Sequence, residues 1–326
     1  MKAVVLVGGE GTRLRPLTLT TPKQMLPVGG RPMIERVLEG LAVHGIDEVV
    51  LSLGYRPDAF IEAYPDGKCA GVRLQYAVEP EPLDTAGAIS FAARHAGLDE
   101  VFVVVNGDVL TDLDVSALIE FHKNRDAEAT IALTPVEDPS RFGVVPTDPD
   151  GRVIAFIEKP PPGEAPTNLI NAGTYVLEPS VLARIPTDRK VSIERETFPA
   201  IVAEGRLFAM ASDADWVDAG TPATFLAANL RHAGPPPGSC RIDDGATVRG
   251  SVLGDDVRVG QGATVEGSVL FDGATVAEGA RVSSSVVGRG ARIGEGADIG
   301  ELSVLGDGVT VAAGTVLRGA RIPEVS

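Results

Sequence analysis

The first half of the chain alternates short runs of apolar, often β-branched residues with stretches in which apolar residues recur at helical spacing. The short runs predict strands, and the stretches between them predict helices that lay one apolar face on a sheet. The predicted strands are 3–7, 48–53, 73–78 and 101–105, and the predicted helices are 32–44, 85–95 and 115–123. Strands that alternate with helices are typical of βαβ units, so we expect an α/β fold with a mostly parallel sheet.

The pattern changes after about residue 128, where turn residues separate short apolar runs. Residues 148–151 (Asp-Pro-Asp-Gly) are a strong turn signal between the runs 144–145 and 153–158. We therefore expect hairpins that are inserted on the sheet. A last helical stretch, 222–232, leads to residues 235–238 (Pro-Pro-Pro-Gly), which cannot continue a helix and predict an inter-domain joint.

A six-residue period follows the joint. Glycine often comes after the apolar residue of each repeat, and the fifth position is mostly small or β-branched. This repeat is similar to that of left-handed parallel β-helices, in which three short strands form one triangular coil. The register breaks at 283–286, where we expect a loop or an irregular coil. The apolar positions are Leu253, Val259, Val265 and Phe271, then Val287, Ile293, Ile299, Leu305, Val311 and Leu317.

Length and composition agree with two domains. The chain has 326 residues, of which 44% are hydrophobic, so it can bury a full core in each domain. We expect an α/β domain over 1–232, a proline-rich linker over 233–239 and the β-helix over 240–326.

A formal net charge of −16 argues against nucleic acid and anionic membranes as partners. Cys69 and Cys240, the two cysteines, lack the spacing of a disulfide framework or a zinc site. The N-terminal apolar run is too short for a signal peptide, and no stretch approaches the ~20 apolar residues of a membrane span. We therefore expect a cytoplasmic protein that acts on small molecules.

A glycine-rich loop, residues 8–18, follows the first predicted strand. Such a loop can bring backbone N–H groups close to phosphates. It fits two familiar loops poorly, because a Rossmann fingerprint needs a small residue where Leu14 stands and a Walker loop ends in Gly-Lys-Ser/Thr. The candidate phosphate contacts in this loop are Gly8, Gly9, Gly11 and Thr12.

Two cations set this segment apart. Arg13 offers a bidentate fork to phosphate oxygens and Lys23 offers a point charge, so together they can neutralise charge on a triphosphate. Lysine is rare in the chain, with six residues, yet Lys23 and Lys159 both fall in recognisable motifs. A solvated basic loop is the plain alternative to a phosphate site.

The glycine-rich loop opens a series of motifs that resembles the signature of the sugar-1-phosphate nucleotidyltransferase family. The resemblance covers roughly residues 1–230, and with its β-helix the chain is most similar to the mannose-1-phosphate guanylyltransferases of that family. It implies a Rossmann-like mixed sheet and transfer of a nucleotidyl group from an NTP to a hexose 1-phosphate, with release of pyrophosphate. The motifs are 8–18, 21–23, 79–87, 106–108, 142–145, 158–160, 171–173 and 216–222.

The resemblance also implies a role for each matched residue. Asp108 and Asp218 are expected to hold Mg²⁺, which bridges phosphate oxygens, and Arg13 and Lys23 are the expected catalytic cations. Besides the loop residues, the expected nucleotide contacts are Glu79, Asp84, Thr85, Ala86, Gly87 and Asn106. The expected contacts of the sugar phosphate are Gly143, Glu158, Lys159, Asn171 and Thr174.

The expected chemistry needs no Ser, Cys or His nucleophile, because the sugar phosphate is itself anionic. The four histidines lie outside every motif, and none follows His232, which argues against acyl transfer by the β-helix. A non-catalytic regulatory subunit is the alternative from another class, but such relatives tend to lose the metal and phosphate residues. Here all five are present: Arg13, Lys23, Asp108, Lys159 and Asp218. We expect the β-helix to mediate a homo-oligomer.

Glu79 and Asp84 bear on the choice of nucleotide. Thymidylyl- and uridylyl-transferring relatives often carry an amide where Glu79 stands, whereas a carboxylate can accept both N1–H and N2–H₂ of guanine. Asp84 stands where the family usually has glycine, and its bulk and charge favour a pyrimidine. Gln24 replaces a usual proline. We therefore place GTP with mannose 1-phosphate only slightly ahead of UTP or dTTP with glucose 1-phosphate.

Overall fold

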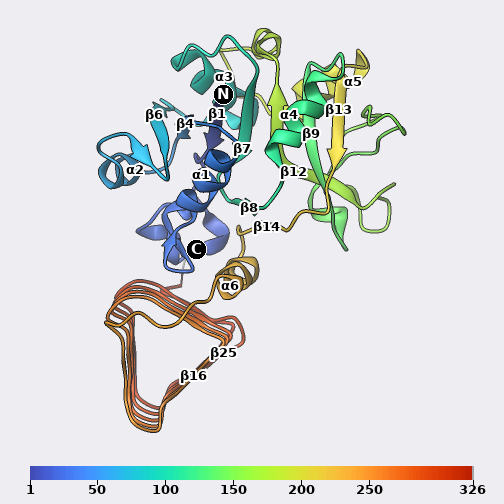
Figure 1. Cartoon of the computed structure of the whole chain (residues 1–326). Helices are drawn as coiled ribbons and strands as arrows, with labels where there is room; N and C mark the ends of the chain where they lie inside the picture. The colour runs from blue at the N-terminus through green and yellow to red at the C-terminus, as the bar shows by residue number, and fades with distance from the viewer. Residues whose placement is uncertain (325–326) are drawn as a thin grey trace. The chain divides into compact units, whose positions relative to one another are not determined.

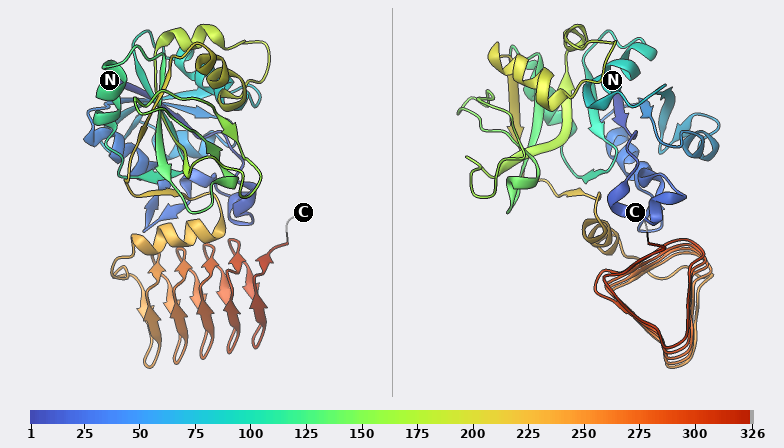
Figure 2. Two further views of the ribbon diagram at one scale, coloured as in Figure 1. Left: turned by 90° about the vertical axis from the view of Figure 1, so that its right-hand side faces the viewer. Right: turned by 180° about the vertical axis from the view of Figure 1, so that it is seen from behind.

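The computed structural model describes residues 1–324 (Figures 1 and 2). The chain divides into two compact units that are each built from two separate segments. The first unit comprises Met1–Gly9 and Ile34–Trp216, and the second comprises Glu10–Met33 and the chain from Val217 onward. Apart from its first two glycines, the glycine-rich loop therefore belongs to the same unit as the β-helix.

A 10-stranded mixed sheet forms the first unit. Its parallel centre runs in the order β6-β4-β1-β7, and β12 lies antiparallel between β7 and β9, with β13 parallel to β9. The four strands predicted from sequence are confirmed to within one residue at each end. The strands are β1 Lys2–Leu6, β4 Glu48–Leu53, β5 Lys68–Cys69, β6 Val72–Val78, β7 Phe102–Asn106, β9 Ala129–Pro135, β10 Gly143–Val144, β11 Ile157–Glu158, β12 Leu169–Leu177 and β13 Leu207–Ala211.

The predicted helices cover this sheet. Helix α3 packs against β1 and β4, and α4 packs against β9, β12 and β13 (Figure 1). Val104, Tyr175 and Phe198 belong to the apolar core beneath them. The helices are α1 Met33–Val43, α2 Asp58–Ala63, α3 Asp84–His95, α4 Val115–Lys123 and α5 Phe198–Ala203.

The region after residue 128 differs in part from the predicted hairpin insertion. β9, β12 and β13 extend the main sheet itself, and β12 is nine residues long. The predicted turn does form, since Thr147 pairs with Val153 across it and Gly151 donates to the carbonyl of Asp148 at 3.0 Å. Apolar runs that continue a sheet cannot be separated from hairpin strands by periodicity alone.

The second unit begins with the glycine-rich loop. The loop, taken from here on as residues 8–26, makes three short 3₁₀ turns, Thr12–Leu14, Leu17–Leu19 and Lys23–Met25, before the hairpin of β2 Pro27–Val28 and β3 Arg31–Pro32. Helix α6, Pro222–Arg231, is capped by the Thr221 hydroxyl, which accepts the Thr224 N–H. The Asn229 side chain of α6 accepts the N–H of Gly29 at 3.0 Å.

The β-helix consists of three parallel five-stranded sheets, which confirms its prediction. Figure 1 shows the triangular coil and the left view of Figure 2 shows the stack. The strands are β15 Arg241–Ile242, β16 Thr247–Arg249, β17 Val252–Leu253, β18 Arg258–Val259, β19 Thr264–Glu266, β20 Val269–Leu270, β21 Thr275–Val276, β22 Arg281–Ser283, β23 Val286–Val287, β24 Arg292–Ile293, β25 Asp298–Gly300, β26 Val304–Leu305, β27 Thr310–Val311, β28 Val316–Arg318 and β29 Arg321–Ile322.

Of the two outcomes expected at 283–286, no inserted loop forms, and the coil is irregular instead. A two-residue corner joins β22 to β23, and the same corner occurs one coil earlier. There Ser268 Oγ accepts the N–H of Ser285, 17 residues on, as Ser251 Oγ accepts the N–H of Ser268. This ladder of buried serines supplies backbone partners between coils, so a corner shorter than the six-residue period can recur.

Phe271 also departs from its predicted place in the apolar repeat. Leu270 takes the interior position, while Phe271 packs edge-on against Phe225 of α6 with ring centroids 6.3 Å apart. No helix within residues 1–324 combines the length and the apolar character that a membrane span requires.

Candidate functional site

The carboxyl ends of the parallel strands collect several predicted site residues at one edge of the first unit's sheet. Open α/β sheets bind ligands at this edge. The N–H of Gly107 donates to the Leu6 carbonyl at 2.9 Å, so the turn after β7 lies directly against the end of β1. The predicted residues that follow or end these strands are Gly8, Gly9, Glu79, Asn106 and Asp108.

Two hydrogen bonds hold the half-buried Glu79 carboxylate. Oε1 accepts from the Ser52 hydroxyl at 3.0 Å, and Oε2 accepts from the backbone N–H of Leu83 at 3.1 Å. Burial raises the pKa of this carboxyl above its ordinary value, and the two hydrogen bonds oppose that rise. A side-chain carbon on Gly8 would lie 3.2 Å from Oε1, so Glu79 adjoins the first loop glycine. Ser52 lies inside β4 and carries no sequence signal of this contact.

Residues 84–87 form the first turn of α3. Asp84 has a φ of 61°, a conformation that glycine favours and that aspartate tolerates better than most residues. Its carboxylate accepts the N–H of Thr85 at 2.8 Å. Asp84 therefore keeps the backbone shape that a glycine at this position would supply.

The N–H groups of this turn have protein partners. Ala86 and Gly87 donate to the Val191 carbonyl at 2.9 and 3.2 Å. The Thr85 hydroxyl donates to Glu194 at 2.7 Å and accepts the N–H of Ile193 at 2.9 Å. These contacts tie the start of α3 to the segment 191–194, so the Thr85 hydroxyl and the N–H groups of Ala86 and Gly87 are used within the protein.

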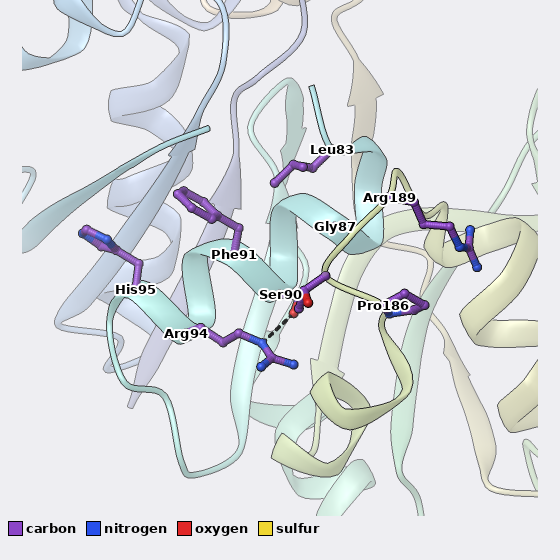
Figure 3. Close-up of a pocket in the computed structure, with 9 residues that line it drawn as sticks. Leu83, Gly87, Ser90, Phe91, Arg94, His95, Pro186 and Arg189 are labelled. Atoms are coloured by element: carbon purple, nitrogen blue, oxygen red, sulfur yellow. Dashed lines mark hydrogen bonds between the residues drawn. The ribbon is translucent and has the colours of Figure 1, made fainter. Parts of the chain in front are cut away.

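A cavity of about 300 Å³ adjoins the same turn (Figure 3). Gly87 is the one predicted nucleotide contact that lines it, beside Leu83. Its arginines have protein partners: Arg94 donates to Ser90 Oγ at 3.0 Å, and Arg189 pairs with Glu196 at 2.6 Å. The further lining residues are Phe91, His95, Pro186 and Thr187.

Strand β12 brings Asn171 and Thr174 next to the end of β7. Thr174 pairs with Val105, and it is only 1% exposed, so its side chain lies in the interior. Asn171 donates to the Tyr175 hydroxyl and accepts the N–H of Gly173, both at 2.9 Å. The register of β12 against β9 shifts between Asn171 and Tyr175, a kind of irregularity that often accompanies functional sites.

Gly143, Glu158 and Lys159 meet in the short hairpin of β10 and β11. Gly143 pairs directly with Glu158, and the N–H of Lys159 donates to the Phe142 carbonyl at 3.0 Å. Lys159 Nζ lies 3.3 Å from Glu158 Oε1 and its side chain is 61% exposed. The hairpin therefore places one exposed cation and one carboxylate side by side.

The remaining site residues belong to the second unit. Thr12 and Arg13 are exposed in the first 3₁₀ turn, whereas Lys23 is 8% exposed. Gly11 has a φ of 63°, and a side-chain carbon there would lie 2.9 Å from Thr18 and 3.0 Å from the Lys23 Cβ. Position 11 therefore requires glycine, because a side chain there would collide with Thr18 and Lys23.

Arg13 faces Asp218 within this unit. Their closest side-chain atoms, Nη2 and Oδ2, are 3.9 Å apart, and Oδ1 of Asp218 accepts the N–H of Gly220 at 2.8 Å. A side-chain carbon on Gly220 would lie 2.6 Å from Arg13 Nη2 and 2.6 Å from Asp218 Oδ1. Gly220, which the sequence motif contained but did not single out, therefore permits this approach.

The predicted ligands of a magnesium ion are two carboxylates, without further protein ligands that would complete its coordination. Within residues 1–324, no group of three or more His, Cys, Asp or Glu side chains gathers. Asp108 and Asp218 are both half-buried carboxylates. Mg²⁺ is usually bound by one or two carboxylates and keeps its other positions for water and substrate phosphates, so each of these carboxylates has the chemistry of a Mg²⁺ ligand.

Comparison with protein families divides the chain in two. Residues 2–233 match the family described as nucleotidyl transferase, and residues 237–317 match the EIF2B subunit epsilon LbH domain. The first match contains every predicted site residue, and the second covers most of the β-helix.

Two curated relatives and one solved structure are similar to most of the chain. The mannose-1-phosphate guanylyltransferase of Mycobacterium tuberculosis is 42% identical over 262 residues, which are 77% of this chain and 72% of that protein. The mannose-1-phosphate guanyltransferase of Aspergillus fumigatus is 46% identical over 230 residues, 69% of this chain. The chain spans 62% of that relative's length.

The solved structure is HddC from Yersinia pseudotuberculosis complexed with GMP-PN. It is 31% identical to the chain with a TM-score of 0.61, and the match covers 71% of this chain and 98% of HddC.

Proposed function

The chain belongs to the nucleotidyl transferase family, and from this premise we propose that it transfers the guanylyl group of GTP to mannose 1-phosphate. The family and the sugar-1-phosphate nucleotidyltransferase class predicted from the motifs are confirmed. The choice of substrates is supported by the 42–46% identity to two relatives named for this reaction. The GMP-PN of the HddC structure agrees with a guanine nucleotide.

The proposed reaction is one in-line displacement. A phosphate oxygen of mannose 1-phosphate forms a bond to the α-phosphorus of GTP. The bond from that phosphorus to the bridging oxygen of the β-phosphate breaks, and pyrophosphate leaves with the electron pair. Because the nucleophile is already an anion, the step needs no general base, and the protein contributes positioning and charge neutralisation.

Two cations of the chain are proposed to neutralise the negative charge of the reacting phosphates. Arg13 and Lys23 lie on the glycine-rich loop, with Arg13 exposed for a phosphate and Lys23 held against Gly11. Guanidinium and ammonium groups stabilise the charge that builds as pyrophosphate departs. Asp108 and Asp218 would hold Mg²⁺, which supplies further charge stabilisation on the phosphate oxygens when bound.

Glu79 supports a guanine base in this proposal. Each of its oxygens has one protein donor, from Ser52 or Leu83, and a carboxylate oxygen can accept a second hydrogen bond. Glu79 is thus held in place with acceptor capacity left for N1–H and N2–H₂ of guanine. Asp84 keeps the backbone conformation of the glycine it replaces, while its bulk and charge remain the argument for a pyrimidine.

The sugar phosphate is assigned to the β10-β11 hairpin and the start of β12. Lys159 would neutralise its phosphate, while Glu158, Asn171 and the Gly143 backbone would bind its hydroxyls. Thr174 would support this pocket from the interior, because its own side chain is buried.

A substrate matrix tests the proposal. GTP, UTP, dTTP, ATP and CTP are each combined with mannose 1-phosphate and glucose 1-phosphate, and pyrophosphate release is measured with Mg²⁺. We expect the highest kcat/KM with GTP and mannose 1-phosphate. A clear preference for UTP or dTTP would reject the guanine assignment and retain the class, and no release with any pair would favour a non-catalytic subunit.

We also propose that the protein assembles into a homo-oligomer through its β-helix. Ile242 in the first coil and Val316 in the last are 44% and 63% exposed, so a contact between two copies could cover either side chain. Light scattering on the full chain should give a mass of at least two copies. A monomer at micromolar concentration would reject this assembly.

A further inference from the structure

One corner of the β-helix holds the glycine-rich loop within the second unit. Four hydrogen bonds join the two segments, although nearly 270 residues or more separate each pair in sequence. The loop segment they hold carries both proposed catalytic cations, Arg13 and Lys23. The β-helix therefore has a direct physical connection to the proposed chemistry.

Asp307 is the centre of this contact. It follows β26, and its Oδ1 accepts the N–H of Arg289 in the preceding coil at 2.8 Å. Its Oδ2 accepts from the Thr20 hydroxyl of the loop at 2.8 Å. One carboxylate thus fixes the corner of the β-helix and the loop at the same time.

Two arginines hold the loop on either side of Asp307. Arg289 donates from Nη1 to the Thr21 hydroxyl at 3.2 Å, two residues before Lys23. Arg321, on β29, donates from Nη1 to the backbone carbonyl of Arg13 at 2.9 Å. The β-helix therefore contacts the loop close to both Lys23 and Arg13.

The regular structure of the loop is confined to short turns. Its three 3₁₀ turns have three residues each, and such short turns are marginal by themselves. A close backbone approach adds to the contact, since a side-chain carbon on Gly306 would lie 3.3 Å from the Pro16 Cβ. Contacts from the β-helix thus add to those within the loop.

We propose that Asp307, Arg289 and Arg321 are positioning residues of the nucleotidyl transfer, which act by fixing the loop that carries Arg13 and Lys23. This role rests on the proposed function, and it makes the β-helix part of the catalytic device as well as a site of assembly. Misplacing a catalytic group by about 1 Å can cost up to about 10²-fold in rate, so a loosened loop should lower kcat.

The test compares Asp307→Ala and Arg321→Ala with the matched control Arg318→Ala. Arg318 also lies in the last coil and pairs with Asp298 at 2.6 Å, on a face of the β-helix that these loop contacts do not use. We expect kcat to fall about tenfold in the first two variants and by less than about twofold in the control. KM for mannose 1-phosphate should stay within about twofold, since the loop is not assigned to the sugar.

Asp307→Asn and Thr20→Val separate positioning from folding. The asparagine amide can still accept the Arg289 N–H and donate to Thr20, so Asp307→Asn should recover most of the activity. Thr20→Val removes only the loop's hydroxyl and leaves the β-helix corner unchanged, so it should reproduce the loss of kcat. Normal kcat in Thr20→Val, Arg321→Ala and Asp307→Ala would overturn the proposal.

Hydrogen exchange over residues 10–26 gives a readout that does not depend on activity. We expect faster exchange of these amides in Asp307→Ala and Arg321→Ala than in Arg318→Ala. If the wild-type chain transfers no nucleotide, the proposed function fails, whereas faster exchange would still show that the β-helix holds the loop. Unchanged exchange in all three variants would overturn the positioning role itself.

Discussion

The Glu79 carboxylate accepts the backbone N–H of Leu83 at 3.1 Å, one residue before the left-handed Asp84. This bond fixes the carboxylate to the turn that opens α3, and Ser52 fixes its other oxygen. The base-reading residue assigned here is therefore held in one orientation before any nucleotide arrives, which lowers the cost of binding.

Glu79→Gln should reduce guanine selectivity without unfolding the protein. Glutamine can present its oxygen to Leu83 N–H and its NH₂ to the Ser52 hydroxyl, so the internal contacts survive. The amide then offers guanine a donor where it needs an acceptor. We expect kcat/KM for GTP to fall by a factor that corresponds to about 1–3 kcal/mol, and that for UTP to change much less. Equal losses with both nucleotides would remove Glu79 from base recognition.

The raised pKa of Glu79 predicts an acid limb in the GTP reaction. Because burial lifts the pKa above 4.5, the carboxylate takes up a proton at a higher pH than an ordinary glutamate. A protonated carboxyl loses acceptor capacity for guanine, so kcat/KM should fall as pH falls through this raised pKa. Glu79→Gln should lack this component, and comparison with it cancels the ionisation of the substrates. Identical acid limbs would contradict the assignment.

The raised pKa of Glu79 also makes the stability of the fold depend on pH. The folded protein binds this proton more tightly than the unfolded chain does, so the contribution of Glu79 to stability is largest below the unfolded pKa and declines as pH rises through the folded pKa. Denaturant unfolding should therefore show Glu79→Gln gaining stability relative to wild type as pH rises above about 4.5.

Gly220→Ala should damage catalysis through Arg13. The added carbon would lie 2.6 Å from both Arg13 Nη2 and Asp218 Oδ1, closer than non-bonded atoms approach. One of the two groups must move, and we expect kcat to fall by about tenfold or more, toward the loss in Arg13→Ala. Gly234→Ala is the matched control, because a carbon there meets no atom within 4 Å. Equal, near wild-type kcat in both glycine variants would separate Arg13 from the transfer step.

Asp108→Asn and Asp218→Asn test the magnesium assignment. Each change keeps the size of the side chain and removes the negative charge, so we expect turnover to fall by about 10²-fold or more and the Mg²⁺ concentration needed for half-maximal rate to rise. Mg²⁺ affinity can also be measured by calorimetry with GTP present. Wild-type turnover in either variant would show that its carboxylate is not a metal ligand.

The β-helix and the strands of the first unit could be predicted from the sequence, because both show a regular pattern of apolar residues. The ends of β1, β6 and β7 carry Gly8, Glu79 and Asn106 because strands and their apolar runs are legible in the residue pattern. The contacts of Ser52 and Thr20 could not be predicted, since they join residues far apart in the chain. The same applies to Phe271, whose apolar character fits the β-helix interior as well as the face of α6.

The serine corners show a further limit. A six-residue period anticipates corners of one size, but Ser251, Ser268 and Ser285 close a shorter one through hydrogen bonds between coils. The sequence pattern breaks at 283–286, but the serine contacts that accompany the break join residues 17 positions apart, so the pattern alone does not predict them.

The most direct test of the account is to incubate the wild-type chain with GTP, mannose 1-phosphate and Mg²⁺ and to follow all phosphorus species by ³¹P NMR. We predict GDP-mannose and pyrophosphate in equal amounts, no product when Mg²⁺ is chelated, and return of GTP when excess pyrophosphate is added. Absence of GDP-mannose under these conditions, with the protein folded, would contradict the proposed function.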